Sequence, residues 1–425
     1  MELGVFFLSL FGFMALGIPI SIVLVLCSVT LMIASGSWDS MTIPQAMMDG
    51  ANSYPLMAIP FFVFAGEIMA EGGLSSRIVR LAQLLIGRIK GGLGYASIVA
   101  SVIFAGLMGS SVGEAAALGS LLLPMMAEVG YKPGRAGGII AAGAIIGPII
   151  PPSTNFILLG ATVGLSITRL FMIGLIPGLL LGLSLLVAWF FVVRADGYND
   201  TIRFTRQEAV KIVIDALPAF ILPVLLLGGI RFGVFTPTEG GAFAAVYAIA
   251  VCMGYYRELS FRDLLRVSCA SARTTAVVMF IVATASAVGW FITSAQIPMQ
   301  LAEKFSFLVD KPLLLLLSIN AFLFIAGMVM DLTPNVLIFA PVFYPIIQQA
   351  GIDPYFFGLL FILNLGIGVI TPPVGTVLYV VCGIGGIQLG ELVRRMLPFV
   401  LVETAVLVLL IFFPQLSLVP LKWLM

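Results

Sequence analysis

Long apolar segments follow one another along nearly the whole chain, and they constrain the fold more than any other feature. Runs long enough to cross a bilayer are expected near 3–18, 19–37, 53–70, 168–193, 216–233, 237–256, 273–293 and 397–414. A helix of about 20 residues spans the hydrocarbon core, and no soluble core has room for this much apolar surface. Because 61% of the residues are hydrophobic and only 10% are charged, the sequence predicts an all-α polytopic membrane protein.

Two further apolar regions, 93–130 and 312–350, are each interrupted midway by small or polar residues. The interruptions are Gly109–Glu114 in the first region and Asp331–Asn335 in the second. The arms on either side, about 15 to 19 residues each, are mostly short for a full crossing. A polar tip facing lipid leaves backbone groups without hydrogen-bonding partners. We therefore expect two re-entrant hairpins with buried or water-facing tips; two ordinary helices joined by a tight turn are the alternative.

A constant spacing of 221 residues relates the two halves of the chain. Seven glycines and prolines find identical residues at that spacing (345 − 124 = 221): Pro124, Gly130, Pro133, Gly137, Gly147, Pro151 and Pro152 match Pro345, Gly351, Pro354, Gly358, Gly368, Pro372 and Pro373. Glycine and proline set backbone geometry, so this agreement indicates a structural repeat, covering about 16–193 and 237–414. The span at 273–293 comes five crossings after its mate at 53–70. This odd number predicts an inverted repeat, as in many secondary transporters.

The distribution of basic residues predicts the orientation. With these spans, 16 of the 21 lysines and arginines fall on one side of the membrane, which the positive-inside rule makes cytoplasmic. The first hairpin then enters from the cytoplasm, the second hairpin enters from outside, and the C-terminus lies outside. Segments 77–90, 200–214 and 259–268 on the cytoplasmic side have amphipathic patterns and are expected to lie in the membrane interface.

Each half has a second interruption, inside an apolar segment that contains a Pro-Pro pair. The segment 136–165 is broken at Gly147–Asn155, and the segment 357–386 is broken at Gly368–Thr376. Proline lacks an N–H and clashes with the preceding turn, so the helix is disrupted there. The break frees carbonyl oxygens, which suit Na⁺, and exposes the N-terminus of a half-helix, which favours an anion. Each hairpin tip with its partner break therefore predicts a binding site near the middle of the membrane.

The expected site residues lie in the two tips and the two breaks. The expected sodium ligands are Gly109, Ser110, Ser111, Gly147, Ile149 and Ser153 in the first half and Met330, Asp331, Thr333, Thr371 and Gly375 in the second. The expected substrate contacts are Ser111, Gly113, Thr154, Asn155, Asn335 and Thr376. Asp331 is expected either to bind a cation or to cap the second arm of its hairpin. Glu114 is expected to interact with the N-terminus of its helix.

The sequence lacks the residue patterns of an ATPase or of a membrane enzyme. It has no histidine, no CxxC among its four cysteines and no GxxxxGK[ST] motif. We therefore expect no catalytic residue, no transition-metal site and no organic cofactor, with Na⁺ as the only coupling ion. A channel is a further alternative, which a current exceeding carrier turnover would reveal.

Over essentially its whole length, the chain resembles the large membrane subunit of a tripartite ATP-independent periplasmic (TRAP) transporter. The resemblance is carried by Ile59–Glu67 (IPFFVFAGE), Gly109-Ser110-Ser111, Pro151-Pro152-Ser153 and Thr371-Pro372-Pro373-Val374-Gly375. It implies an elevator-type carrier in a bacterial inner membrane, driven by Na⁺ bound at two hairpin–broken-helix junctions.

The resemblance also implies two partner proteins. One is a small four-helix membrane subunit, expected on a separate chain, and the other is a periplasmic protein that captures the substrate. Substrates of such transporters are organic acids, notably C4-dicarboxylates and sialic acid, and the sequence looks most similar to the sialic acid type. A Na⁺-coupled carrier of dicarboxylates or other organic anions that works without a binding protein is the alternative.

Overall fold

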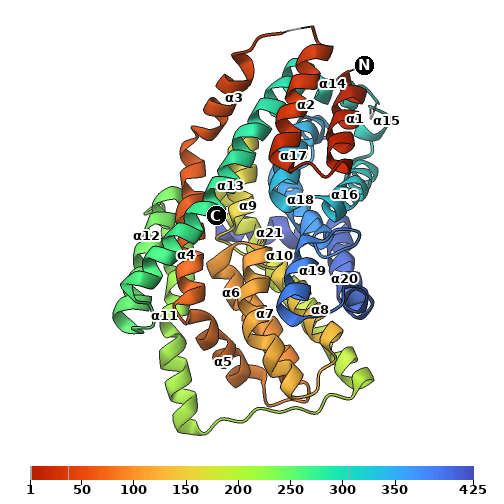
Figure 1. Ribbon diagram of the computed structural model, residues 1–425. Coiled ribbons are helices and arrows are strands. Elements are labelled where there is room, and N and C mark those ends of the chain that lie inside the picture. The colour runs from red at the N-terminus through yellow and green to blue at the C-terminus, as the bar shows by residue number, and fades with distance from the viewer. Residues whose placement is uncertain (1, 37, 305) are drawn as a thin grey trace.

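The computed structural model describes residues 2–36, 38–304 and 306–425, and this part of the chain consists of helices joined by loops (Figure 1). The predicted all-α class is therefore confirmed. Six helical stretches are long and apolar enough to cross a membrane: Tyr54–Glu71, Ile167–Asp196 (α10), Arg206–Arg231 (α11), Phe261–Ser294 (α13), Pro312–Val329 (α16) and Leu389–Phe412 (α20). The last residue of the predicted span 19–37 lies outside the described residues.

The other helices, together with η1 and α4, which make up the stretch Tyr54–Glu71, complete the described part of the chain. In the first half they are α1 (Glu2–Ala15), α2 (Ile20–Ala34), α3 (Thr42–Ala51), η1 (Tyr54–Met57), α4 (Ala58–Glu71), α5 (Leu74–Ile86), α6 (Gly92–Met108), α7 (Ser111–Glu128), α8 (Pro133–Ala144) and α9 (Thr154–Val163). In the second half they are α12 (Pro237–Ile249), η2 (Ala250–Tyr255), α14 (Ile297–Lys304), α15 (Ser306–Val309), α17 (Leu332–Gln349), α18 (Pro354–Gly368), α19 (Thr376–Gly385) and α21 (Gln415–Leu424). The part of the chain from residue 2 to residue 36 contains two helices, α1 and α2, separated where Gly17 has a φ of +76°, a conformation that favours glycine.

Two of the three predicted amphipathic segments are the first turns of long helices rather than separate interfacial helices. Thr205 and Glu208 form a reciprocal capping box at the start of α11, and Ser260 and Asp263 form another at the start of α13. Each box satisfies N–H groups that a helix start otherwise leaves unpaired. Helices α11 and α13 therefore begin inside the polar segments and continue into the apolar ones. The third segment is α5, which begins at Leu74 and ends at Ile86.

The helices pack in two groups. We call α2, α3, α4, α11, α12 and α13 the scaffold, because α13 packs along α2, α3 and α4 while α12 packs against α4 and α11 (Figure 1). We call α6–α10 and α16–α20 the core, because α16 packs against α18, α20 against α8, and α7 against α8 and α19. The two groups meet where α4 contacts α6 and α9 and where α13 contacts α17.

Corresponding helices in the two halves of the chain begin and end at nearly the 221-residue spacing of the repeat. Helices α7 and α17 differ by 221 residues at both ends (332 − 111 and 349 − 128). Both Pro-Pro peptide bonds, at Pro151–Pro152 and Pro372–Pro373, are cis. The scaffold differs, because α3, η1 and α4 form a broken path whereas α13 is continuous. Ser53, just before η1, has an extended backbone (φ −114°, ψ 123°), and Pro55 has no N–H with which to continue a helix from α3, whereas Ala276 at the corresponding position has one.

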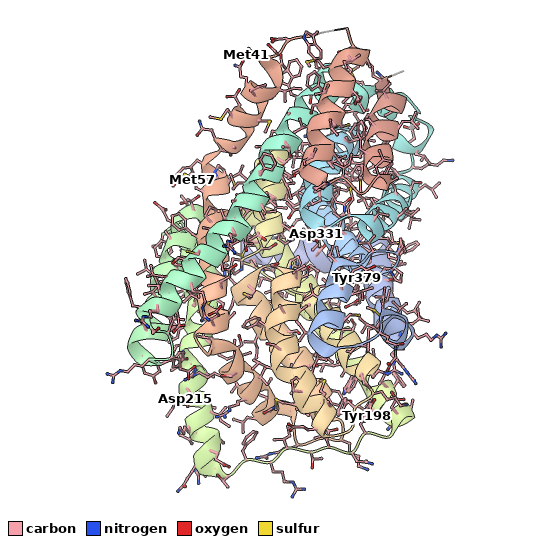
Figure 2. The ribbon with its side chains drawn as sticks, viewed as in Figure 1. Met41, Met57, Tyr198, Asp215, Asp331 and Tyr379 are labelled. Carbon is pink, nitrogen blue, oxygen red and sulfur yellow. The ribbon has the colours of Figure 1, made fainter. Side chains whose placement is uncertain are left out.

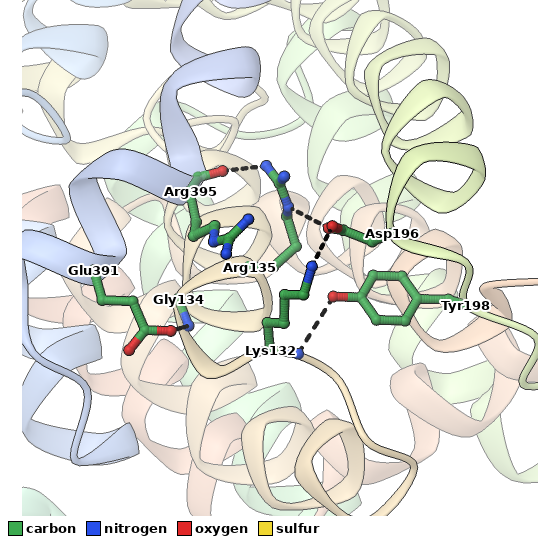
Figure 3. A network of polar contacts seen from close by, with 7 residues as sticks. All are labelled: Lys132, Gly134, Arg135, Asp196, Tyr198, Glu391 and Arg395. Atoms are coloured by element: carbon green, nitrogen blue, oxygen red, sulfur yellow. Dashed lines mark hydrogen bonds and ion pairs between the residues drawn. The ribbon is translucent and has the colours of Figure 1, made fainter.

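A buried ion-pair network joins the ends of α8, α10 and α20 (Figure 3). The Asp196 carboxylate accepts hydrogen bonds from Lys132 Nζ at 2.6 Å and from Arg135 Nε at 2.9 Å. The Arg135 guanidinium also donates to the backbone carbonyl of Arg395, and the Glu391 carboxylate accepts from the Gly134 N–H at 3.1 Å. The side chains of Arg135 and Asp196 are only 10% and 7% exposed, so the pair is shielded from water.

Three stacked aromatic rings extend this network to the first hairpin. The rings of Tyr131, Tyr198 and Trp189 all contact one another: the two tyrosine centroids lie 4.2 Å apart, and the Trp189 centroid lies 5.8 and 5.9 Å from them. Trp189 Nε1 donates to the Gly91 carbonyl, and the Tyr131 hydroxyl donates to Asp200, whose carboxylate also accepts from the Leu93 N–H. Burial, reinforced by the neighbouring Asp200, raises the pKa of the Tyr131 hydroxyl. The hydroxyl therefore remains a donor at physiological pH.

Substituting Gly94 by alanine is expected to destabilise the protein, because α6 lies directly against the Trp189 ring. A Cβ atom at Gly94 would lie 2.0 Å from Trp189 Cε2, and overpacking of this kind costs about 1–3 kcal/mol. Thermal unfolding in detergent measures the loss. Gly228→Ala on α11 is the matched control, because a Cβ there meets nothing within 4 Å. Equal melting temperatures for the two variants would contradict the expected clash.

Candidate functional site

The first hairpin tip is hydrogen-bonded to the first helix break. Gly109 ends α6 with a φ of +61°, and Ser110 caps α7 by accepting a hydrogen bond from the Gly113 N–H. Across the gap, the Thr154 hydroxyl donates to the Gly109 carbonyl at 3.0 Å. A Cβ at Gly109 would lie 2.4 Å from the Pro152 carbonyl oxygen, so only glycine allows the tip to approach the break this closely.

Three of the sodium ligands expected in the first break already contact neighbouring groups of the protein. Ser153 caps α9: its hydroxyl accepts from the Phe156 N–H at 3.2 Å and donates to the Pro148 carbonyl at 2.5 Å. The Ile149 carbonyl lies against Gly174 of α10, where a Cβ would be 2.1 Å away. Gly147 lies beside both the Glu114 carboxylate and the Ser110 carbonyl, 2.5 and 3.4 Å from the position of a Cβ. Gly147, like Thr154, therefore lies next to oxygen atoms of the tip.

The second hairpin tip is joined to the second break in a similar way. The Thr376 hydroxyl, in the first turn of α19, donates to Asp331 Oδ1 at 3.0 Å, and the Val374 N–H donates to the Met328 carbonyl at 3.1 Å. Asp331 occupies the N-cap position of α17, but its side chain makes no capping hydrogen bond. Both expected roles for Asp331, cation ligand and helix cap, stay predictions. The Thr371 hydroxyl, by contrast, donates to the Ile367 carbonyl within its own helix.

Glu114 and Asn335 occupy equivalent positions, 221 residues apart, and both are fully buried. The Asn335 amide donates to the carbonyls of Met330 and Asp331 at 3.0 and 2.9 Å, which fixes the second tip. Its Oδ1 atom has no hydrogen-bonding partner among the described residues, and neither has either oxygen of Glu114, although Ser101 lies close to that carboxylate. Buried polar atoms without hydrogen-bonding partners are rare, and each one calls for an explanation such as a bound ion or water. The sequence interpretation missed Glu114 as a site residue, although the 221-residue spacing pairs it with Asn335.

Both tips open onto one cleft of about 230 Å³. This site cleft is lined on the core side by Ser110, Ser111, Val112, Thr154, Asn155, Leu158, Asp331, Leu332 and Thr333, and on the scaffold side by Ile59 and Val63 of α4 and Thr274 and Val278 of α13. Figure 2 shows Asp331 midway along the molecule, between Met41 at one end and Tyr198 at the other. The starts of α7, α9 and α17 meet here, and helix N-termini favour negative charge.

The site cleft brings together six of the predicted site residues: Ser110, Ser111, Thr154, Asn155, Asp331 and Thr333. Gly113 lines a neighbouring cleft, Asn335 is buried behind the second tip, and Thr376 reaches the site cleft through its bond to Asp331. The predicted sodium ligands Gly109, Gly147, Ile149, Ser153, Met330, Thr371 and Gly375 lie in the tips and breaks behind the cleft lining.

Two further clefts lie on the same boundary between scaffold and core. The inner cleft, about 590 Å³, is lined by Glu67, Ala70, Glu71, Gly73, Ser75, Ser76 and Ala270 opposite Met108, Gly113, Ala116, Ala117, Ser120 and Leu121. The outer cleft, about 340 Å³, is lined by Asp49, Gly50, Ser53, Leu56, Val282, Ala285, Ser286, Gly289 and Thr293 opposite Ala161, Thr162, Leu337 and Pro341. The names follow the predicted orientation of the chain.

Several apolar helices that surround a polar cleft built from interrupted helices define a multi-pass membrane transporter. The chain belongs to the family described as "Tripartite ATP-independent periplasmic transporter, DctM component", whose model matches residues 7–416. The resemblance noted in the sequence is thereby confirmed, and the members of this family are transporters rather than enzymes.

Two relatives match the chain over nearly its whole length. It is 46% identical over 423 residues to the 2,3-diketo-L-gulonate TRAP transporter large permease protein YiaN of Escherichia coli (strain K12), with 100% of both chains covered. It is 36% identical over 413 residues to the sialic acid TRAP transporter large permease protein SiaM of Vibrio cholerae, with 96% of this chain and 97% of the relative covered.

The fold is also similar to that of a solved transporter. The crystal structure of the YdaH transporter from Alcanivorax borkumensis matches with a TM-score of 0.66 at 17% sequence identity, and the match covers 89% of this chain and 88% of that one. At this identity the likeness shows a shared fold only.

Proposed function

We propose that this chain carries an organic acid anion, of the sugar-acid class, into the cell together with Na⁺. The observation that carries the proposal is the site cleft, where the N-termini of α7, α9 and α17 converge beside hydroxyl groups and one carboxylate. Helix N-termini attract the anion, and backbone and carboxylate oxygens behind the tips attract the cation. One net positive charge crossing 100 mV supplies about 2.3 kcal/mol, so the ion gradient drives accumulation without ATP.

The proposed sodium sites lie behind the two tips. At the first, Glu114 is fully buried beside Gly147, neither of its oxygens has a hydrogen-bonding partner among the described residues, and the Ser110 carbonyl also lies beside Gly147. At the second, Asp331 is held by a single hydroxyl donor, from Thr376, and lines the site cleft. Both sets consist of oxygen atoms, the ligand type that hard cations prefer. The fit is therefore good for Na⁺ at both positions.

The substrate proposal follows the relatives and the charge of the cleft. The relative named for 2,3-diketo-L-gulonate is 46% identical and the one named for sialic acid is 36% identical. Both compounds are sugar acids that carry one carboxylate. We therefore place 2,3-diketo-L-gulonate ahead of sialic acid as the first substrate to test.

The proposed mechanism is an elevator, in which the core moves against the scaffold. The inner, site and outer clefts all lie along one scaffold–core boundary, so a single sliding movement of the core would carry the site past them. The matched bounds of α7 and α17 support an inverted repeat, which supplies two related end states. Membership of the family supports the remaining parts of the proposal: a bacterial inner membrane, a small four-helix membrane subunit and a periplasmic binding protein.

Uptake into proteoliposomes that contain this chain and its small-subunit partner tests the proposal. Labelled 2,3-diketo-L-gulonate and labelled sialic acid are supplied with and without an inward Na⁺ gradient and with and without their binding proteins. Uptake that needs both Na⁺ and a binding protein is the expected result. Uptake with Na⁺ alone would favour an independent carrier, and equal uptake without Na⁺ would contradict the coupling.

A further inference from the structure

The outer and inner clefts are lined by residues that correspond in the 221-residue repeat. On the core side, Leu337 and Pro341 of the outer cleft match Ala116 and Ser120 of the inner cleft (337 − 116 = 221; 341 − 120 = 221). On the scaffold side, Asp49 of the outer cleft matches Ala270 of the inner cleft (270 − 49 = 221). The two clefts are therefore equivalent positions of the two halves.

The site cleft extends this correspondence. Thr274, which lines the site cleft, matches Ser53, which lines the outer cleft (274 − 53 = 221). Helices α4 and α13 end at Glu71 and Ser294, 223 residues apart, because the break at η1 changes the register.

At the 223-residue spacing, the two α4 residues of the site cleft also find mates in the outer cleft. Ile59 matches Val282 (282 − 59 = 223), and Val63 matches Ser286 (286 − 63 = 223). Three of the four scaffold residues that face the site cleft thus have their counterparts in one place, the outer cleft.

We propose that the substrate site occupies two alternative positions on the scaffold, which we call seats, and that the outer cleft is the second of them. Ser53, Val282 and Ser286 then face the substrate when the site is open to the outside. This inference rests on the proposed elevator function. In the structure the two tips lie against Thr274 and Val278 of α13. In the opposite state the two tips lie against Val282 and Ser286, eight residues further along α13. At 1.5 Å per residue, the tips move about 12 Å along the helix.

The proposal explains why the outer cleft contains hydroxyl groups and small residues within a membrane-embedded scaffold. The outer cleft is lined by residues with small side chains or none, among them Ser53, Ser286, Gly50 and Gly289. A Cβ at Gly289 would meet nothing within 4 Å, so the cleft has free space at that position. The passing tips and their substrate fit this space in the opposite state.

Paired cysteines test the two seats. The native cysteines Cys27, Cys252, Cys269 and Cys382 are first replaced, and Val112→Cys on the first tip is combined with either Val278→Cys or Ser286→Cys on α13. A reducible bifunctional maleimide is then added to the protein in proteoliposomes. Both pairs are expected to link, and each link is read from proteolytic fragments that stay joined before reduction of the linker and separate after it.

A third pair, Val112→Cys with Val277→Cys, is the control, because Val277 is 61% exposed and adjoins Val278 on the same helix. If the Ser286 pair links no more than this control while the Val278 pair links efficiently, the second seat is wrong. If both seats link but uptake shows no Na⁺ dependence, the second seat stands and the proposed coupling fails.

A bulky substitution in the outer cleft gives a separate readout. Gly289→Trp is expected to fill the outer seat and abolish uptake, while binding of ²²Na⁺ to the solubilised protein is retained. Gly228→Trp on α11, where a Cβ also meets nothing within 4 Å, is expected to leave uptake unchanged. Equal uptake by the two tryptophan variants would overturn the proposal.

Discussion

Replacing Asp331 by asparagine is expected to weaken Na⁺ binding about a hundredfold and to stop Na⁺-driven uptake. The Asp331 carboxylate accepts a hydrogen bond from the Thr376 hydroxyl at 3.0 Å and stands at the N-cap position of α17. Two unit charges about 4 Å apart attract by about 4 kcal/mol at an effective dielectric constant of 20. Dehydration of the ion offsets part of this, so about 2.8 kcal/mol, or two factors of ten, is the expected net loss. Titration of the solubilised protein with ²²Na⁺ measures the affinity.

The controls for this variant separate binding from stability. Without Na⁺, Asp331→Asn should be about as stable as the parent, because Asp331 is only half-buried and asparagine keeps an oxygen that can accept from Thr376. Asp353→Asn is the matched control, since the Asp353 carboxylate caps α18 through the N–H groups of Tyr355 and Phe356. Because asparagine caps a helix about as well as aspartate, that control should leave both the melting temperature and the Na⁺ affinity close to those of the parent. Unaltered Na⁺ affinity in Asp331→Asn would remove this residue from the proposed site.

Replacing Asp196 by alanine is expected to lower the free energy of unfolding by about 3–5 kcal/mol, the usual cost of leaving a buried charge without its partner. Arg135, only 10% exposed in its side chain, would lose the carboxylate that Nε contacts at 2.9 Å. Lys132 is 45% exposed and can turn to water, so most of the loss arises from Arg135. Chemical or thermal unfolding in detergent measures the effect.

The double variant Arg135→Met/Asp196→Leu separates loss of the pair from burial of an unpaired charge. Because it replaces both charges with apolar side chains, it should be more stable than Asp196→Ala alone. A double variant that is less stable than the single one would show that the pair itself, rather than the orphaned Arg135, provides the stability.

Much of the fold follows from local signals in the sequence. Apolar length predicts α10 and α20, and the interrupted regions coincide with α6–α7 and α16–α17. The continuity of α11 and α13 was missed because their first turns are polar. The capping boxes at Thr205 and Ser260 are present in the sequence as T-x-x-E and S-x-x-D. They mark the starts of α11 and α13, which the amphipathic pattern alone does not indicate.

The site could be predicted only to the level of its segments. Tips and breaks are visible as polar or proline-rich interruptions, but the direction of a single carbonyl, such as that of Ile149, depends on tertiary packing against Gly174. The scaffold lining, Thr274 and Val278, carries no local signal, since these residues are ordinary members of an apolar helix. Glu114 differs, because comparison with Asn335 at the repeat spacing would have singled it out.

The charged network at the ends of α8 and α10 also bears on how the chain is inserted into the membrane. Lysine and arginine set topology, whereas acidic residues contribute little. Lys132 and Arg135 therefore act as unpaired positive charges while the chain is being oriented, and they meet Asp196 only when the helices assemble. We infer that the same two side chains serve first as topological signals and later as cross-links. Asp196→Ala should accordingly leave the orientation unchanged in a cysteine-accessibility assay, even though it weakens the folded protein.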